Sequence, residues 1–170
     1  MKSCTACTPE PLAALSKQDE QGLRLAFRQA LRAREHGNHP FGAVLQDANG
    51  EPILAAENSV VSQHDVTGHA ELNLVRLASR DIAAARLQNS TLYCSSEPCP
   101  MCAGAIVWAN VRRVVYGLGM EDIYALAKIP PGLPALHLGS RAVFASAPYS
   151  MEIIGPALEQ EARAPHLGFW

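Results

Sequence analysis

The sequence has no long apolar run, no excess of basic residues and few cysteines, and each absence narrows the class of protein. No apolar stretch approaches the roughly 18 residues of a membrane span, and the first residues lack the apolar core of a secretory leader. Fourteen basic residues against 16 acidic ones give a net charge of −2, so no overall basic surface marks a nucleic-acid-binding protein. We therefore expect no membrane association, and we expect a small molecule rather than nucleic acid as the partner.

Cysteine is scarce, with five residues, an odd number. A chain of 170 residues is expected to form one domain that buries roughly 70% of its unfolded surface, which is enough for a core without disulfides. Cys94 lies in a predicted buried strand, where a thiol behaves as a small hydrophobe. Cys4 and Cys7 have C-x-x-C spacing, which could mark a second metal or redox pair, but a loose terminus is the alternative. A reducing cytoplasm is the expected location.

What the chain does have is three soft metal ligands and one carboxylate in two short stretches. Cys99 and Cys102 form a C-x-x-C pair, and His69-Ala70-Glu71 lies about thirty residues upstream. Catalytic zinc typically has three protein ligands and a fourth position for water, whereas structural zinc has four protein ligands. No second Cys or His pair near this core supplies a fourth ligand. We therefore expect one Zn²⁺ per chain on His69, Cys99 and Cys102, with water or hydroxide in the fourth position.

The flanking residues place these ligands at helix N-termini. Pro98 disfavours helix before it and Pro100 suits a first helical position, so both cysteines lie near the start of a predicted helix over 98–110. Thr67 is expected to cap a second helix, which opens at His69. The unpaired N–H groups and the positive dipole end of such a terminus favour thiolate, the form that binds zinc.

The rest of the chain predicts a sheet between helices. Asn49-Gly50, between two apolar runs, is a strong signal of an antiparallel hairpin. Later strands alternate with helices, which implies parallel pairing and helices on both faces of the sheet. The predicted elements are a helix capped by Ser16 and Asp19 with the apolar stripe Leu23, Phe27, Ala30 and Leu31; strands at 41–45, 53–56, 91–95, 113–117 and 151–154; helices from 69 and 98; and a short helix near 156–163. Residues 128–141, rich in Pro and Gly, are expected to have little regular structure.

The pattern His-x-Glu…Pro-Cys-x-x-Cys is the signature of zinc nucleobase deaminases, and the chain resembles the cytidine-deaminase-like superfamily over roughly residues 16 to 125. The resemblance implies an α/β class: a three-layer α/β/α fold with a five-stranded mixed sheet and helices on both faces. Together with the sequence at the two ends, it leads us to expect a loose lead-in at 1–15, a deaminase domain at 16–155, and a helix with an aromatic tail at 156–170.

The resemblance also assigns roles to residues of the site. Glu71 would take a proton from the attacking water and deliver it to the substrate, as general base and then acid, although a carboxylate that only complements the helix dipole is the alternative. Asn58, Phe41, Ala70 and Trp108 are the expected substrate contacts. For Asn58 a turn-forming role is the alternative, and for Phe41 and Trp108 it is core packing.

The stretch around Phe41 resembles a pocket strand of guanine and cytosine deaminases, and Asn58 matches a substrate-binding position of purine-type members. Asp65 and Trp108 look more like guanine deaminases than cytidine deaminases. We therefore predict a hydrolytic deaminase of a purine-type nucleobase or nucleoside, guanine foremost, that releases ammonia. A tRNA adenosine deaminase acting on a flipped anticodon base, a cytosine-type deaminase and a zinc-stabilised interaction subunit without catalysis are the alternatives. The resemblance also implies a homodimer, in which the aromatic tail (Phe169 and Trp170) packs on its own subunit or covers a neighbour's pocket.

Overall fold

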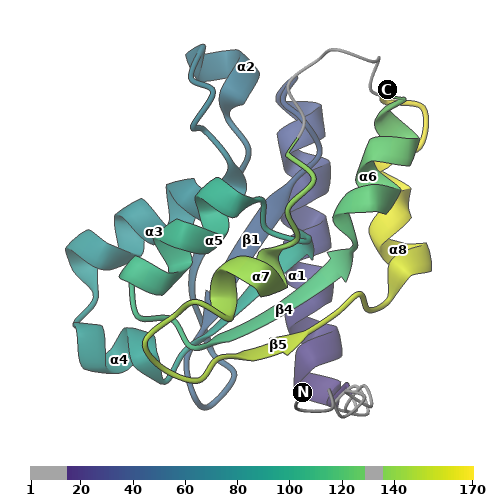
Figure 1. Ribbon diagram of the computed structural model, residues 1–170. Helices are drawn as coiled ribbons and strands as arrows, with labels where there is room; N and C mark the ends of the chain where they lie inside the picture. Colours follow the sequence, from purple (N-terminus) through teal and green to yellow (C-terminus); the bar gives the residue numbers. More distant parts are fainter. Residues whose placement is uncertain (1–14, 129–135) are drawn as a thin grey trace, which may run out of the picture.

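The computed structural model describes residues 15–128 and 136–170, so residues 1–14 of the predicted lead-in, with Cys4 and Cys7, and the stretch 129–135 lie outside the described residues. A five-stranded sheet has the order β2-β1-β3-β4-β5 (Figure 1). The strands are β1 (Gly42–Gln46), β2 (Pro52–Glu57), β3 (Thr91–Ser96), β4 (Arg113–Leu118) and β5 (Glu152–Ile154). β1 pairs antiparallel with β2 and β3, and β4 pairs parallel with β3 and β5. The predicted mixed sheet, its hairpin and its parallel pairing are confirmed.

Helices cover both faces of this sheet (Figure 1). On one face, α1 (Lys17–Glu35) and α8 (Glu159–Arg163) pack with inward residues such as Tyr93 and Val115. On the other, α3 (Ala70–Asp81) and α5 (Pro100–Trp108) pack with Leu92 and Val114, because successive strand residues point to opposite faces. The three-layer α/β/α class is therefore confirmed. Within the described ranges, no helix combines the length and apolarity that crossing a bilayer requires.

α1 starts as the sequence predicts and departs from the prediction at one position. The backbone N–H of Asp19 donates to Ser16 Oγ, and the N–H of Ser16 donates to the Asp19 carboxylate, both at 3.1 Å. The predicted apolar stripe is buried except for Leu31, which is 42% exposed. Including Leu31 was wrong, because one residue beyond the buried Ala30 the helix has turned about 100° toward solvent.

Four short helices were not predicted. They are α2 (Val60–Gln63), α4 (Ala84–Gln88), α6 (Met120–Ala127) and α7 (Ser140–Phe144). Each has at most about two turns, which is too short for a helical hydrophobic period to be recognised. α7 also begins inside the stretch for which we expected little regular structure, so that expectation was wrong at its C-terminal end.

The segment 164–170, which starts with the 3-10 helix η1 (Ala164–His166), folds back onto α1. Arg34 Nη1 donates to the carbonyls of Pro165 and Leu167, at 2.9 and 2.7 Å. His166 is buried, and its Nδ1 accepts a hydrogen bond from the indole Nε1 of Trp170 at 3.3 Å. The aromatic tail packs on its own subunit, which is one of the two placements expected for it.

We predict that the protein loses stability as the pH falls from about 6.5 to about 4 because of His166. Burial, and then the charge of Arg34, lower the pKa of His166 to about 4. In this window the unfolded chain, with an ordinary pKa of about 6.5, binds a proton that the folded protein does not, so unfolding becomes more favourable. The loss is complete near pH 4 and amounts to about 3 kcal/mol. Urea unfolding between pH 7 and 4 should show a flatter profile for His166→Gln, and identical profiles would contradict the prediction.

Candidate active site and metal centre

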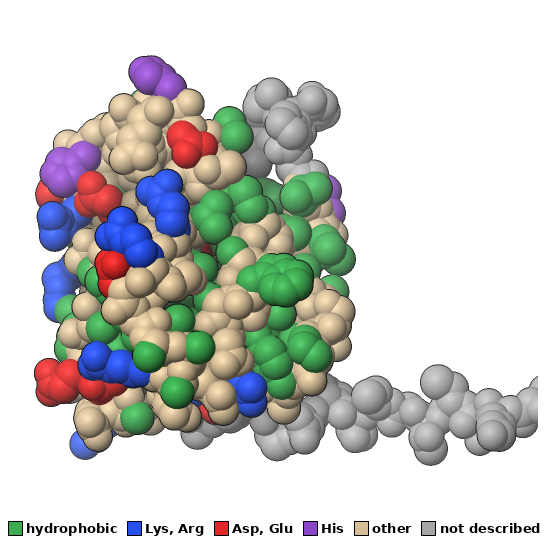
Figure 2. All heavy atoms as spheres, turned by 90° about the vertical axis from the view of Figure 1, so that its left-hand side faces the viewer, with side chains coloured by type: hydrophobic (Ala, Val, Ile, Leu, Met, Phe, Trp, Pro, Cys, Tyr) green, Lys and Arg blue, Asp and Glu red, His purple; other side chains and the backbone are tan. Residues whose placement is uncertain are grey.

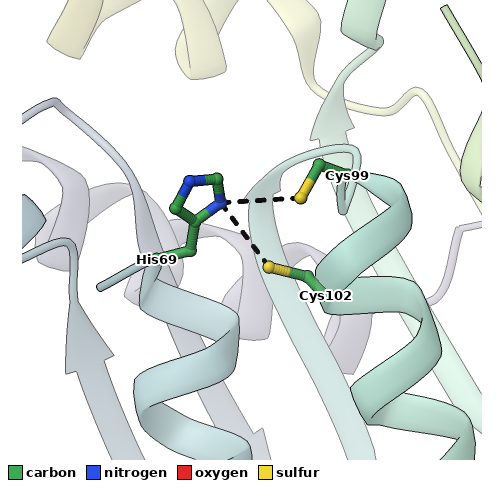
Figure 3. Close-up of side chains that lie close together, drawn as sticks. All are labelled: His69, Cys99 and Cys102. Atoms are coloured by element: carbon green, nitrogen blue, oxygen red, sulfur yellow. Dashed lines mark hydrogen bonds between the residues drawn. The ribbon is translucent and has the colours of Figure 1, made fainter. Parts of the chain in front are cut away.

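His69, Cys99 and Cys102 converge from two helix N-termini, and Figure 3 shows their side chains pointing toward one another. His69 is the N-cap of α3, Cys99 is the N-cap of α5, and Cys102 lies in the first turn of α5. His69 Nδ1 lies 3.6 Å from the Sγ atoms of both cysteines. Tetrahedral zinc, with Zn–N of about 2.0–2.1 Å and Zn–S of about 2.3 Å, separates nitrogen and sulfur by about 3.6 Å. The donor atoms and their spacing therefore fit one zinc ion.

The cluster has three ligands and not four. Its donor atoms lie within 4.8 Å of one another, and among residues 15–128 and 136–170 no fourth His, Cys, Asp or Glu joins them. Glu71 lies beside the cluster, with its Oε2 3.7 Å from Cys102 Sγ. Three protein ligands leave a coordination position for water or substrate, which is the arrangement of catalytic zinc.

The two thiols are electrostatically unequal. The pKa of Cys99 is lowered to about 4, mainly because the Cys102 thiol donates a hydrogen bond to it and also because of the neighbouring His69. The same hydrogen bond, followed by burial, raises the pKa of Cys102. Cys99 is therefore ready as a thiolate, and a cation held by the three donor atoms would deprotonate Cys102 as well.

Glu71 is a buried carboxyl group in the first turn of α3. Burial raises its pKa to about 7, against the opposing effect of the charge of His69. A positive ion at the neighbouring donor atoms would favour the ionised form and lower that pKa again. Glu71 is thus placed where it can exchange a proton with a group beside the metal ligands.

Thr67 does not cap α3, so that prediction was wrong. Its Oγ1 and its backbone N–H donate to Asp65 Oδ1, at 2.7 and 2.8 Å, which closes a turn before the helix. His69 is the N-cap instead, with an extended backbone (φ −69°, ψ 147°) and no side-chain capping bond. The imidazole of His69 faces the two sulfur atoms as a result.

Glu97 organises the loop that carries Cys99, to a degree that the sequence did not show. Its Oε1 accepts from the backbone N–H and the hydroxyl of Ser140, at 2.8 and 2.9 Å, and its Oε2 accepts from the N–H of Met120 at 3.1 Å. One carboxylate therefore serves the N-termini of both α6 and α7. The partners lie 23 and 43 residues away in the chain, so no local pattern could reveal them.

Of the four predicted substrate residues, Ala70 lies directly beside a metal ligand, and Asn58 and Phe41 are joined to each other by a hydrogen bond. Ala70, the residue after His69, is the first residue of α3 and is buried. Asn58 is buried, its backbone N–H donates to the carbonyl of Phe41 at 3.0 Å, and its Oδ1 accepts from the N–H of Val60 at 3.1 Å. Among the described residues, Asn58 Nδ2 has no hydrogen-bond partner and remains available as a donor.

Trp108 does not lie with the other predicted contacts. It is the last residue of α5, six residues beyond Cys102 and hence about 9 Å along the helix axis, and its side chain is 91% exposed. The alternative of core packing is wrong, because the end of α5 points the indole away from the sheet. The structure does not bring Trp108 to the metal ligands of its own chain.

Known proteins are similar to this chain in sequence and in structure. Residues 16–118 match the family model described as the cytidine and deoxycytidylate deaminase zinc-binding region. A probable cytosine deaminase of Schizosaccharomyces pombe is 40% identical over 92% of this chain and 94% of its own length. The guanine deaminase of Bacillus subtilis is 44% identical over 49% of this chain and 53% of its own. A structure solved in a study of tRNA:A34 deaminases has a TM-score of 0.60 and 32% identity, over 79% of this chain and 96% of that one.

These matches confirm the predicted superfamily, and they agree with the donor set found in the structure. The family match contains His69, Cys99 and Cys102, and their geometry fits the zinc that the family binds. The predicted hydrolase class follows from the same relatives. The chain belongs to the cytidine and deoxycytidylate deaminase family of zinc-dependent enzymes, which hydrolyse C–N bonds of cyclic amidines in nucleobases or nucleosides.

Proposed function

We propose that this deaminase acts on a free nucleobase, with cytosine as the first candidate and guanine as the second. The end-to-end likeness to a probable cytosine deaminase carries the proposal, because the likeness to a guanine deaminase spans about half of each chain. The sequence pattern favours guanine, so the comparison changes the order of the candidates and keeps both.

The donors near the site support a base that carries a ring carbonyl. Asn58 Oδ1 already accepts a hydrogen bond from the backbone N–H of Val60, so Asn58 would present Nδ2 as a donor to the substrate. The N–H of Ala70, in the first turn of α3, has no partner inside the helix and is a second candidate donor. Cytosine and guanine each have a carbonyl oxygen that accepts such hydrogen bonds, whereas the only hydrogen-bond acceptors of adenine are ring nitrogens. Phe41, bonded through its carbonyl to Asn58, would flank the base.

In the proposed reaction, water replaces the exocyclic amine: a C–O bond forms, a C–N bond breaks and ammonia leaves. His69, Cys99 and Cys102 would hold the zinc, which when bound lowers the pKa of a coordinated water from 15.7 to about 7. Glu71 accepts a proton from the attacking water, donates a proton to the ring nitrogen and assists the departure of the amine. A positioned proton carrier of this kind typically contributes about 10²–10⁴-fold to the rate.

A panel of free bases and nucleosides tests the proposal. Protein loaded with one equivalent of zinc is incubated with cytosine, cytidine, guanine, guanosine, adenine and adenosine, and ammonia is measured. We expect release from cytosine or guanine, and faster release than from the matching nucleoside. Release from the nucleosides alone, or from none of the six, would contradict the proposal.

A second candidate, deamination of adenosine within tRNA, is favoured by the structural likeness to tRNA:A34 deaminases. The net charge of −2 offers no overall basic surface for such a substrate. Binding of labelled tRNA as a function of salt distinguishes the two. Steeply salt-dependent binding would support tRNA as the substrate, and no binding at low salt would eliminate it.

We also propose a homodimer that uses the outer face of α5. Met101, Gly104, Ala105 and Trp108, spaced three and four residues apart, share this face, and Met101 and Trp108 are exposed. Figure 2 faces the side of the molecule that lies at the left of Figure 1. In this view the larger hydrophobic side chains lie mostly on the right and the charged side chains mostly on the left. Exposed apolar patches mark interaction sites, and tryptophan is a frequent interface anchor. In a dimer, Trp108 would approach the second copy.

Replacing Trp108 by glutamate should convert the dimer to a monomer, because a carboxylate would have to be desolvated at the centre of the apolar face. Sedimentation at micromolar concentration measures the change. Leu31→Glu is the matched control, since Leu31 is an exposed apolar residue on α1, and this variant should remain dimeric. A monomeric wild type, or a dimeric Trp108→Glu variant, would contradict the proposed interface.

Two further expectations remain proposals. We propose a reducing, cytoplasmic location, which is consistent with the free thiols of Cys94, Cys99 and Cys102. We also propose that residues 16–155 form the catalytic domain, to which 156–170 are added. The site ligands and all five strands fall within the first range.

A further inference from the structure

Cys99 and Cys102 reach the metal centre from different kinds of backbone. Cys102 lies inside the first turn of α5, and its side chain is fully buried. Cys99 lies at the edge of the helix, as its N-cap, on the loop that joins β3 to α5, and it is only partly buried. The hydrogen bonds of α5 therefore fix the position of Cys102, whereas the direction of the chain at Cys99 also depends on what holds the loop.

Two prolines make this loop stiff. Pro98 and Pro100 stand on either side of Cys99, and a proline fixes its own φ and restricts the backbone of the residue before it. Cys99 has the extended conformation (φ −65°, ψ 167°) that a following proline favours. Few backbone torsions are therefore free between Glu97 and Cys99, and a shift of Glu97 would be transmitted to the sulfur atom of Cys99.

Glu97 is held through both its backbone and its side chain. Its N–H donates to the carbonyl of Leu118, the last residue of β4, at 2.7 Å. Its Oε1 accepts from the N–H and the hydroxyl of Ser140, at 2.8 and 2.9 Å, and its Oε2 accepts from the N–H of Met120 at 3.1 Å. Met120 and Ser140 are the first residues of α6 and α7, and α7 lies beside α5 (Figure 1). One carboxylate therefore joins the loop before α5 to the starts of two other helices.

We propose that Glu97 is a positioning residue for the metal centre: its carboxylate fixes the loop against α6 and α7 and thereby directs the Cys99 thiolate toward the metal position. Glu97 is outside the group of donor atoms, so it acts through Cys99 and not as a ligand. Side chains that orient a metal ligand in this way typically contribute about 10–100-fold to metal affinity. The inference goes beyond the proposed function, because zinc binding requires no substrate.

Zinc affinity, measured by competition with a chromophoric chelator, tests the inference. Glu97→Gln keeps the length of the side chain but turns one of its two acceptors into a donor, so the N–H of either Met120 or Ser140 loses its acceptor. We expect the folded variant to bind zinc about 10–100-fold more weakly than the wild type. An unchanged zinc affinity in folded Glu97→Gln would overturn the inference.

Asp19→Asn is the matched control for a purely structural effect. The Asp19 carboxylate also accepts from the N–H and the hydroxyl of a serine, Ser16, at a helix start. It lies at the other end of the sheet, where it bonds Arg113, whose strand partner is the first residue of β3. Both substitutions should lower the urea concentration at the unfolding midpoint, but Asp19→Asn should leave the zinc affinity unchanged. Equal weakening of zinc binding in the two variants would reduce the effect of Glu97 to general stability and overturn the inference.

Ser140→Ala keeps the inference testable if Glu97→Gln does not fold. It removes only the hydroxyl that donates to Glu97, and the N–H of residue 140 remains. Because one hydrogen bond is lost, we expect zinc binding to weaken by about threefold. If Glu97→Gln does not fold, weaker zinc binding in Ser140→Ala supports the positioning role, and an unchanged affinity contradicts it.

Discussion

Replacing Glu71 by glutamine should lower ammonia release by about 10²–10⁴-fold while zinc remains bound. Glutamine keeps the size and burial of the side chain and removes its capacity to accept a proton. Glu71 is outside the group of three donor atoms, so the variant should still bind one zinc per chain. Ammonia release and zinc content, measured on the same preparation, check both parts of the prediction.

The control for this variant is Glu35→Gln, which removes an exposed carboxylate at the end of α1 and should leave the rate unchanged. Near-wild-type turnover in Glu71→Gln would show that another group carries the proton. Loss of zinc in this variant would show instead that Glu71 belongs to the metal site, and the proposed division of roles would then be wrong.

Removing zinc with a chelator should abolish ammonia release and leave the fold largely intact. The rate should vanish because no neighbouring side chain can lower the pKa of water as far as the metal does. The fold should persist because two apolar clusters, one on each face of the sheet, are built largely from residues remote from the three ligands. Far-ultraviolet circular dichroism and ammonia release before and after chelation measure the two effects.

One equivalent of zinc should restore the activity, whereas Mg²⁺, which prefers oxygen ligands, should not. A protein that unfolds cooperatively on chelation would support the alternative that zinc is a structural element. Activity that survives complete removal of zinc would remove the metal from the mechanism altogether.

The parts of the fold that depend on neighbouring residues could be predicted from the sequence. Asn49-Gly50 predicted the hairpin between β1 and β2, and the capping box at Ser16 predicted the start of α1. The metal ligands were predictable for the same reason, since His69 and the cysteine pair each stand in a short pattern with a helix start beside it. Such signals are complete within a few residues and need no knowledge of the rest of the chain.

The parts that failed depend on contacts between distant residues. The orientation of Trp108 follows from where α5 ends relative to the sheet, and no periodicity distinguishes an exposed apolar face from a buried one on a helix that is apolar all round. The partners of Glu97 lie on two helices far along the chain. The ring of Trp170 likewise meets those of His39 and Phe41, which lie about 130 residues earlier in the chain. The choice of base depends on several such contacts together, so the sequence pattern alone could not determine it.

X-ray absorption at the zinc edge of the purified protein tests the central claim most directly, because it reports the atoms bound to the metal. We predict two sulfur atoms at about 2.3 Å, and two nitrogen or oxygen atoms at about 2.0–2.1 Å with the outer-shell signal of one imidazole. A shell with a third sulfur or a second imidazole would mean that the fourth position is closed by the protein. That result would contradict a zinc centre open to water and substrate.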